Sequence, residues 1–167
     1  MSSENPVETV QRSLRDLMRQ NAGNGRLVVA IDALDAAAAT AFADGFAAAV
    51  GEDGTAVFRA TLADDAGDVR EKLVAPFRAG EPFGDGDVAP DRAVLVVDGR
   101  FLHAAGLRGL SNWSVWLEAN PPFGAPRPEL PDAEKRYLRE ARPKAAASVI
   151  VENSDPAHPV QVFGDFC

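Results

Sequence analysis

The strongest constraint on the fold is a pair of continuous apolar runs that each end at an aspartate, RLVVAID at 26–32 and RAVLVVDG at 92–99. Such runs are typical of parallel strands that helices cover on both faces. Strand-like and helix-like segments alternate along the rest of the chain, and this alternation favours right-handed crossovers and a parallel sheet. We therefore predict an α/β fold in which a parallel sheet of about five strands forms the middle of three layers.

The other elements follow from hydrophobic periodicity and from turn residues. Further strands are predicted at 55–62, 112–119 and 148–154. Helices are predicted within 4–25, at about 36–50, at 64–80, at 100–111 and at 132–147, the last with Pro143 in or near its final turn. Neither a linker nor an internal repeat interrupts the pattern, so residues 1–167 are predicted to form a single domain.

Composition narrows the classes of function. The formal net charge of −8 and the pI of about 4.7 disfavour a general role in binding nucleic acid or membrane surfaces. The single cysteine, Cys167, has no partner for a disulfide, which suits a reducing compartment. The polar N-terminal stretch does not resemble a secretory signal, and the longest apolar run, 36–43, is too short to span a membrane. We expect a cytoplasmic protein.

Ligands of parallel sheets bind outside the carboxyl ends of the strands. The polar positions there are 32–40, 61–65 and Asp98. A phosphate-binding loop has the pattern GxxxxGK[ST], in which glycines let backbone N–H groups surround the phosphates, lysine reaches the terminal phosphates and the hydroxyl holds magnesium. Laid over that pattern, ALDAAAAT at 33–40 puts Ala33 and Ala38 at the glycines, Ala39 at the lysine and Thr40 at the hydroxyl.

The segment RLVVAIDALDAAAATAFAD at 26–44 resembles the opening of the uridine kinase family of P-loop kinases, whose typical run is close to VAIDGxDGAGKTTFAD. The matching residues are Ala30, Ile31, Asp32, Asp35, Thr40, Phe42, Ala43 and Asp44. Two later segments, 92–119 and 136–162, are similar to the family's Asp-Gly strand and to its closing segment, in the family's order. The resemblance implies a P-loop NTPase-like fold, binding of ATP and Mg²⁺, and phosphorylation of a nucleoside.

Departures from the family concern the parts that carry its chemistry. Alanines replace the glycines and the lysine of the phosphate loop. Asp64 and Asp65 stand where the family has an aspartate that acts on the nucleoside hydroxyl, but the acceptor insert that follows, at about 66–92, is shortened. The lid at about 120–133 is also shortened, and Arg127 is its only arginine. Asp64, Asp65 and Arg127 are therefore candidates only for relics of catalytic groups.

The alanine run favours a helix over a phosphate loop. Alanine forced into a left-handed conformation costs roughly 1–2 kcal/mol per residue, whereas it is the best helix former. Asp35 precedes the run and is a suitable N-cap, which places a carboxylate at the helix end that would otherwise attract phosphate. Without a lysine at position 39, no side-chain cation from this loop offsets the charge that develops in phosphoryl transfer. We predict that ATP-dependent kinase activity is lost.

Each candidate residue also has a structural interpretation. Asp32 is a relic of the phosphate loop or a turn cap, and Thr40 is a magnesium ligand or a hydroxyl bonded to its own helix. Asp98 is the best candidate for a residual polar site, with Thr40 as the second possible metal relic. The alternative for Asp64 and Asp65 is the acidic N-terminus of a helix.

Other chemistry has less support in the sequence. His103 and His158 are isolated, which argues against a zinc site. Ser111 and Ser114 lack a histidine at recognisable spacing, and Cys167 lacks an electropositive neighbour, so nucleophilic catalysis is not expected. The aromatic residues near the lid are expected either in the core or in an apolar patch that would mark a partner surface; they are Trp113, Trp116 and Phe123.

Three functions remain open. The first is a degenerate, uridine-kinase-like protein that binds a protein partner or itself, requires no cofactor and uses 32–40 only as a relic of the phosphate loop. The second is an active nucleoside or small-molecule kinase that binds ATP and Mg²⁺ through Asp32, Thr40 and Asp98. The third is a sensor that binds a small ligand in the old cleft without turnover.

Overall fold

The computed structural model describes residues 3–64 and 67–163. The strands are β1 (Arg26–Asp32), β2 (Ala56–Thr61), β3 (Ala93–Gly99), β4 (Trp113–Glu118), β5 (Val149–Glu152) and β6 (Val160–Val162). The helices are α1 (Pro6–Ala22), α2 (Ala36–Gly51), the π-helical η1 (Arg70–Val74), α3 (Ala75–Ala79), the 3₁₀-helical η2 (Ala105–Leu107), α4 (Asp132–Ala141) and α5 (Pro143–Ala146). The protein is thus an α/β protein, as predicted.

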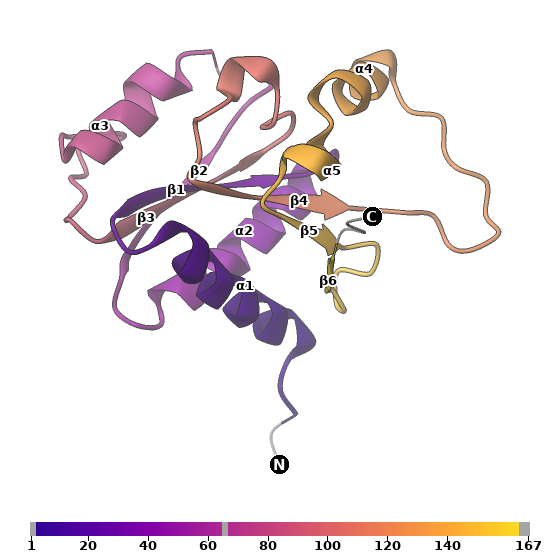
Figure 1. The fold of residues 1–167 in the computed structure, drawn as a ribbon, viewed down its shortest axis with the longest axis horizontal. Coiled ribbons are helices and arrows are strands. Elements are labelled where there is room, and N and C mark those ends of the chain that lie inside the picture. The colour runs from indigo at the N-terminus through magenta and orange to yellow at the C-terminus, as the bar shows by residue number, and fades with distance from the viewer. Residues whose placement is uncertain (1–2, 65–66, 164–167) are drawn as a thin grey trace.

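The sheet has the strand order β2-β3-β1-β4-β5-β6 (Figure 1). The first five strands are parallel, and β6 runs antiparallel to β5. Because the chain leaves β1 toward β2 and leaves β4 toward β5, the strand order reverses between β1 and β4. The carboxyl ends of these two strands are where an open α/β sheet binds ligands.

Alternate residues of the buried strands face two separate cores. α1 and α2 cover the face of β1 that carries Val29 and Ile31, whereas α3 and the chain around η2 cover the face that carries Val28 and Ala30 (Figure 1). Both apolar runs, β1 and β3, are buried almost throughout, which confirms that they are strands covered on both faces.

α2 packs against both α1 and the sheet and is therefore apolar on most of its surface. Phe46 is fully buried and stacks on Trp113 of β4 with ring centroids 6.1 Å apart. Gly45 permits the close approach of α1, because a Cβ atom there would lie 2.3 Å from Nε2 of the buried Gln11. That amide nitrogen donates a hydrogen bond to the carbonyl of Phe42.

The sequence predictions were wrong at three places in the fold. The helix predicted at 100–111 is only the short η2, with Phe101 at φ 60°. The helix predicted at 132–147 breaks at Arg142, which has φ 49° and precedes Pro143, because a residue before proline is disfavoured in the α conformation. The strand at 148–154 is not the last, since β6 follows it.

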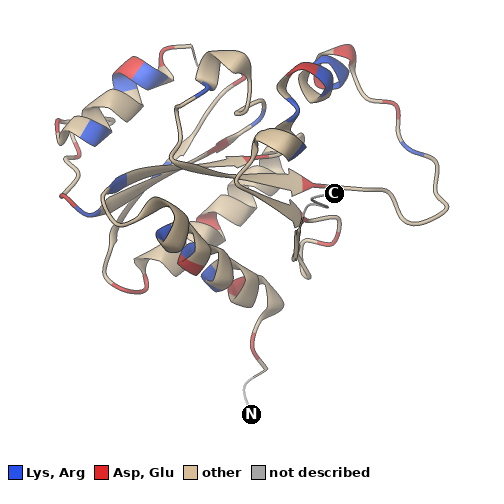
Figure 2. Ribbon diagram, in the orientation of Figure 1, with Lys and Arg blue, Asp and Glu red and all other residues tan. Residues whose placement is uncertain are grey.

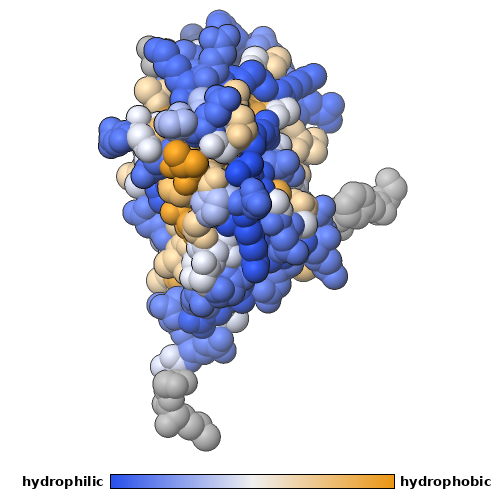
Figure 3. All heavy atoms as spheres, turned by 90° about the vertical axis from the view of Figure 1, so that its left-hand side faces the viewer, coloured by the Kyte–Doolittle hydropathy of each residue, from blue (hydrophilic) through white to orange (hydrophobic). Residues whose placement is uncertain are grey.

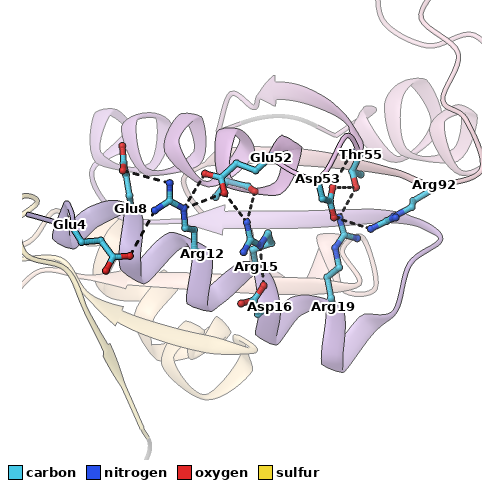
Figure 4. Close-up of polar contacts among 11 residues, drawn as sticks. Glu4, Glu8, Arg12, Arg15, Asp16, Arg19, Glu52, Asp53, Thr55 and Arg92 are labelled. Atoms are coloured by element: carbon cyan, nitrogen blue, oxygen red, sulfur yellow. Dashed lines mark hydrogen bonds and ion pairs between the residues drawn. The ribbon is translucent and has the colours of Figure 1, made fainter. Parts of the chain in front are cut away.

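Basic residues of α1 and α4 alternate with acidic ones (Figure 2). On α1 the arginines form an ionic cluster with the turn that follows α2 (Figure 4). Arg12 and Arg15 pair with Glu52 at 3.0 and 3.1 Å, and Arg15 also donates to the carbonyl of Ala49 at 3.0 Å. Arg19 contacts the hydroxyl of Thr55 at 2.7 Å. The cluster ties the first helix of the chain to the end of α2.

Replacing Arg15 by alanine should lower the free energy of unfolding by about 1–2 kcal/mol, because the side chain is largely buried and bonds both a carbonyl and a carboxylate. The matched control is Arg139→Ala, whose side chain is 71% exposed, and its effect should stay within about 0.5 kcal/mol. Urea unfolding at low and high salt measures both. An Arg15→Ala effect no larger than that of the control would contradict this account of the cluster.

None of the helices in the described ranges combines the length and the apolar character needed to cross a bilayer.

Candidate functional site

The carboxyl ends of β1 and β3 bring together two predicted site residues, Thr40 and Asp98. The Thr40 hydroxyl lies 2.6 Å from Oδ2 of Asp98, which is fully buried at the end of β3. The same hydroxyl lies 3.1 Å from the carbonyl of Ala36, so its single proton is shared between the carboxylate and its own helix, and the contact with the helix is one of the two interpretations of Thr40. The Thr61 hydroxyl of β2 lies 3.0 and 3.2 Å from the two carboxylate oxygens of Asp98.

A cation that the sequence analysis did not single out completes this group. Arg59 of β2 places Nη1 2.7 Å from Oδ1 of Asp98 and donates from the same nitrogen to the carbonyl of Val96 at 2.8 Å. Its Nε and Nη2 both contact Oδ1 of Asp44 on α2, at 3.1 and 3.0 Å. Arg59 therefore joins β2, β3 and α2 around one buried carboxylate.

α2 begins at Ala36, directly after Asp35, as the sequence predicted. Oδ1 of Asp35 accepts hydrogen bonds from the N–H groups of Ala37 and Ala38 at 3.0 and 3.3 Å, which confirms Asp35 as the N-cap. The side chain of Ala39, on α2, is fully buried in the core that α1 and α2 form with the sheet. Ala33 is also buried, and its N–H donates to the carbonyl of Gly99 at 3.4 Å. Two amides in the first turn of α2, those of Ala37 and Ala38, are thus bonded by a side chain of the protein itself.

Asp32, at the end of β1, is fully buried and bonded by two side chains that close over it. The Tyr137 hydroxyl of α4 donates a hydrogen bond to Oδ2 of Asp32, and Nδ1 of His103 lies 2.7 Å from the same oxygen. Burial raises the pKa of Tyr137, and the neighbouring carboxylate of Asp32 raises it further, so the phenol stays protonated. The carboxylate of Asp32 bonds these side chains and not a local turn, so the turn-cap interpretation was wrong.

His103 also contacts Ser114 of β4, a pairing that no recognisable spacing in the sequence indicated. Nε2 of His103 lies 2.9 Å from the Ser114 hydroxyl oxygen, and the N–H of Ser148 donates a hydrogen bond to this oxygen at 3.2 Å. A neutral imidazole satisfies every contact if Nδ1 donates to Asp32 and Nε2 accepts from Ser114.

The order serine–histidine–aspartate matches that of hydrolytic triads. Ser114 is only 6% exposed, however, and Tyr137 and His103 close the end of the sheet above it. A nucleophile must present its oxygen to a substrate, and this one points into a filled interior. The chain of contacts instead connects β1, β4, the segment after β3 and α4 through hydrogen bonds between buried groups.

The remaining predicted site residues do not join either group. Asp64 lies before η1 and not in the first turn of a helix, and its carboxylate is 3.9 Å from Nε of Arg100. Asp65 and Cys167 lie outside the described residues. Arg127 is exposed in the loop 119–131, and within the described ranges it forms no ion pair. A shallow cavity of about 560 Å³ lies along the segment after β2; Thr61, Leu62, Lys72 and Leu73 are among its lining residues.

The aromatic residues near the lid divide into two groups. Trp113 and Trp116 are buried in the core, at 2% and 4% exposure, whereas Phe123 is fully exposed. Only Phe123 therefore fits the expectation of an apolar partner surface.

Sequence reasoning missed three residues of the site: Arg59, His103 and Tyr137. One signal was available for Arg59, since a charged residue inside a strand of a mostly apolar sheet must find a buried partner. His103 and Tyr137 are 71 and 105 residues from Asp32, and no local spacing connects them.

No protein-family model matches this sequence, and a search of curated proteins finds no significant match. The structure is similar to that of a possible uridine kinase from Bacillus stearothermophilus, with a TM-score of 0.59 and 17% sequence identity over 85% of this chain and 97% of that one. It also matches a putative fructose transport system kinase from Silicibacter sp. TM1040, with a TM-score of 0.43 and 17% identity over 91% of this chain and 86% of that one. The chain shares its α/β fold with the first of these two structures.

Proposed function

We propose that this protein is a degenerate member of the P-loop kinase fold that does not transfer phosphoryl groups and acts by binding a protein partner. One observation carries the proposal: the amides at the start of α2 are bonded by the carboxylate of Asp35, at the helix end where a P-loop kinase binds phosphate. A phosphate there would have to displace this carboxylate and would meet its negative charge.

The closure of the sheet edge supports the same proposal. The ligand position of an open α/β sheet lies between the ends of β1 and β4. Here Tyr137 and His103 fill it and are bonded to Asp32. A nucleotide could bind there only if both side chains moved away from the buried carboxylate of Asp32. That movement costs more free energy than displacing water, because the carboxylate would lose its hydrogen-bond donors.

The surface offered to a partner is the loop 119–131, which extends away from the sheet (Figure 1). The loop contains five prolines, and the exposed Phe123 lies in a turn closed by a hydrogen bond from the N–H of Ala125 to the carbonyl of Pro122, with Gly124 at φ 83°. A stiff loop loses little entropy on binding, and exposed aromatic and arginine side chains are enriched in interfaces. The opposite end of the molecule is mostly hydrophilic with one small apolar patch (Figure 3).

Thermal unfolding with ATP and Mg²⁺ tests the proposal. A ligand at a hundred times its dissociation constant adds about 2.7 kcal/mol of stability, and each kcal/mol raises the Tm of a protein of this size by roughly 2–4 °C. We expect no shift at millimolar ATP and no release of ADP with uridine. A shift together with uridine-dependent ADP release would identify an active kinase, and a shift without turnover would identify a ligand sensor.

A further inference from the structure

The buried carboxylate of Asp98 has a cationic partner of its own. Asp98 is fully buried at the end of β3, and three side chains from two different elements surround it: Thr40 from α2, and Thr61 and Arg59 from β2. A buried carboxylate requires a compensating charge or donors. The guanidinium of Arg59, 2.7 Å from Oδ1, supplies the charge, and the two hydroxyls supply donors.

P-loop kinases hold Mg²⁺ beside the hydroxyl at the position of Thr40. The residues present here do not fit that ion. Mg²⁺ takes oxygen ligands at about 2.0–2.1 Å in an octahedron. The Thr40 hydroxyl bonds directly to Oδ2 of the carboxylate at 2.6 Å, and the permanently charged guanidinium of Arg59 lies against Oδ1, so a cation already occupies the position beside this carboxylate and would repel a divalent ion.

Arg59 is also fixed more firmly than a mobile surface cation. Its Nη1 donates to the carbonyl of Val96 at 2.8 Å, and its Nε and Nη2 contact the Asp44 carboxylate on α2. Three nitrogens thus contact a carbonyl and two carboxylates, which holds the planar guanidinium in one orientation. The side chain of Asp44 is 66% exposed, so most of the buried electrostatic interaction is with Asp98.

We propose that Arg59 is the resident cation of this site and takes the place of a divalent metal ion, so that the carboxyl edge of the sheet is stable without any metal. This inference concerns the cation alone and holds whatever the protein binds. Its consequence is that removing the guanidinium leaves a vacant cation position lined by the oxygens that contact it now, from Asp44, Val96 and Asp98.

Thermal unfolding of the wild type, of Arg59→Ala and of Arg59→Ala/Asp98→Asn, with and without millimolar Mn²⁺ at matched ionic strength, tests this. We expect no effect of Mn²⁺ on the wild type and a Tm of Arg59→Ala lower by about 6 °C or more. Mn²⁺ should then raise the Tm of Arg59→Ala but not that of the double variant. The proposal would be overturned if Arg59→Ala had the Tm of the wild type. It would also be overturned if Mn²⁺ raised the Tm of the wild type as much as that of Arg59→Ala, or if Mn²⁺ left the Tm of Arg59→Ala unchanged.

A second measurement keeps the inference testable if Arg59→Ala does not fold. Paramagnetic Mn²⁺ broadens the NMR signals of nearby amides, so it can be added to the wild-type protein directly. We expect the amide signals of Thr40, Thr61 and Asp98 to be broadened no more than those of exposed acidic residues. Selective broadening of these three signals would show that a metal enters beside Arg59 and would overturn the proposal.

Discussion

Ala39→Lys, which places a lysine where the phosphate-loop pattern has one, is expected to destabilise this protein by about 3–5 kcal/mol. Ala39 is fully buried in the core between α2 and the sheet, so the longer side chain would overpack that core and its ammonium would lack a buried partner. In a phosphate-loop conformation the same lysine would instead reach the phosphates. Denaturant unfolding of the variant measures the difference.

Ala37→Lys is the matched control, because Ala37 lies on the exposed side of the same helical turn. A cation in the first turn of a helix costs only about 0.3–1 kcal/mol. If Ala39→Lys were as stable as this control and also bound ATP, the segment 33–40 would be able to form a phosphate loop, and our account of it would be wrong.

Tyr137 should make the second large contribution to stability. Its ring packs on Phe101 with centroids 4.9 Å apart, and its hydroxyl donates to the buried Asp32. Tyr137→Ala should therefore cost about 3–5 kcal/mol, and Tyr137→Phe, which removes only the hydroxyl, about 1–3 kcal/mol. Urea unfolding at neutral pH compares the two variants. A Tyr137→Phe protein as stable as the wild type would show that the bond to Asp32 contributes nothing.

The pH dependence of the Tyr137 contribution has a defined sign. Burial and the carboxylate of Asp32 raise the pKa of this phenol in the folded protein above that of an unfolded tyrosine. The stability gained over Tyr137→Phe should therefore be complete below about pH 10 and should decrease as the pH rises above that value. Tyr137 is the only tyrosine, so the tyrosinate absorbance of the native protein reports it alone. Native titration near the ordinary pKa of tyrosine would contradict the burial.

The middle strands of the sheet could be predicted from the sequence, because a long apolar run is stable in water only when both of its faces are buried. β1 and β3 are therefore placed correctly, and the Asp35 cap follows from a local rule that needs no tertiary contact. β6 was missed because three residues are too few to show alternation. The break at Arg142 was missed because Pro143 was expected inside the helix. A proline disfavours the helical conformation of the residue before it, and Arg142 is that residue.

The candidate site was only partly predictable for a different reason. Parallel strands bring their carboxyl ends together, so the proximity of Thr40 and Asp98 follows from topology once each is placed after a strand. Side chains that arrive from loops and distant helices do not follow such a rule. The contacts of His103 and Tyr137 with Asp32 depend on how α4 and the segment after β3 fold back over the sheet.

The central claim is that α2 begins at Ala36, that Asp35 bonds the amides of Ala37 and Ala38, and that this helix end does not bind phosphate. NMR of the wild-type protein tests it directly, through the Cα secondary shifts of residues 33–40 and the response of their amides to ATP with Mg²⁺. We predict helical shifts from Ala36 onward and amide signals that do not move at millimolar ATP. Non-helical shifts at 36–39, together with amide signals at 33–40 that move and saturate with ATP, would contradict the account.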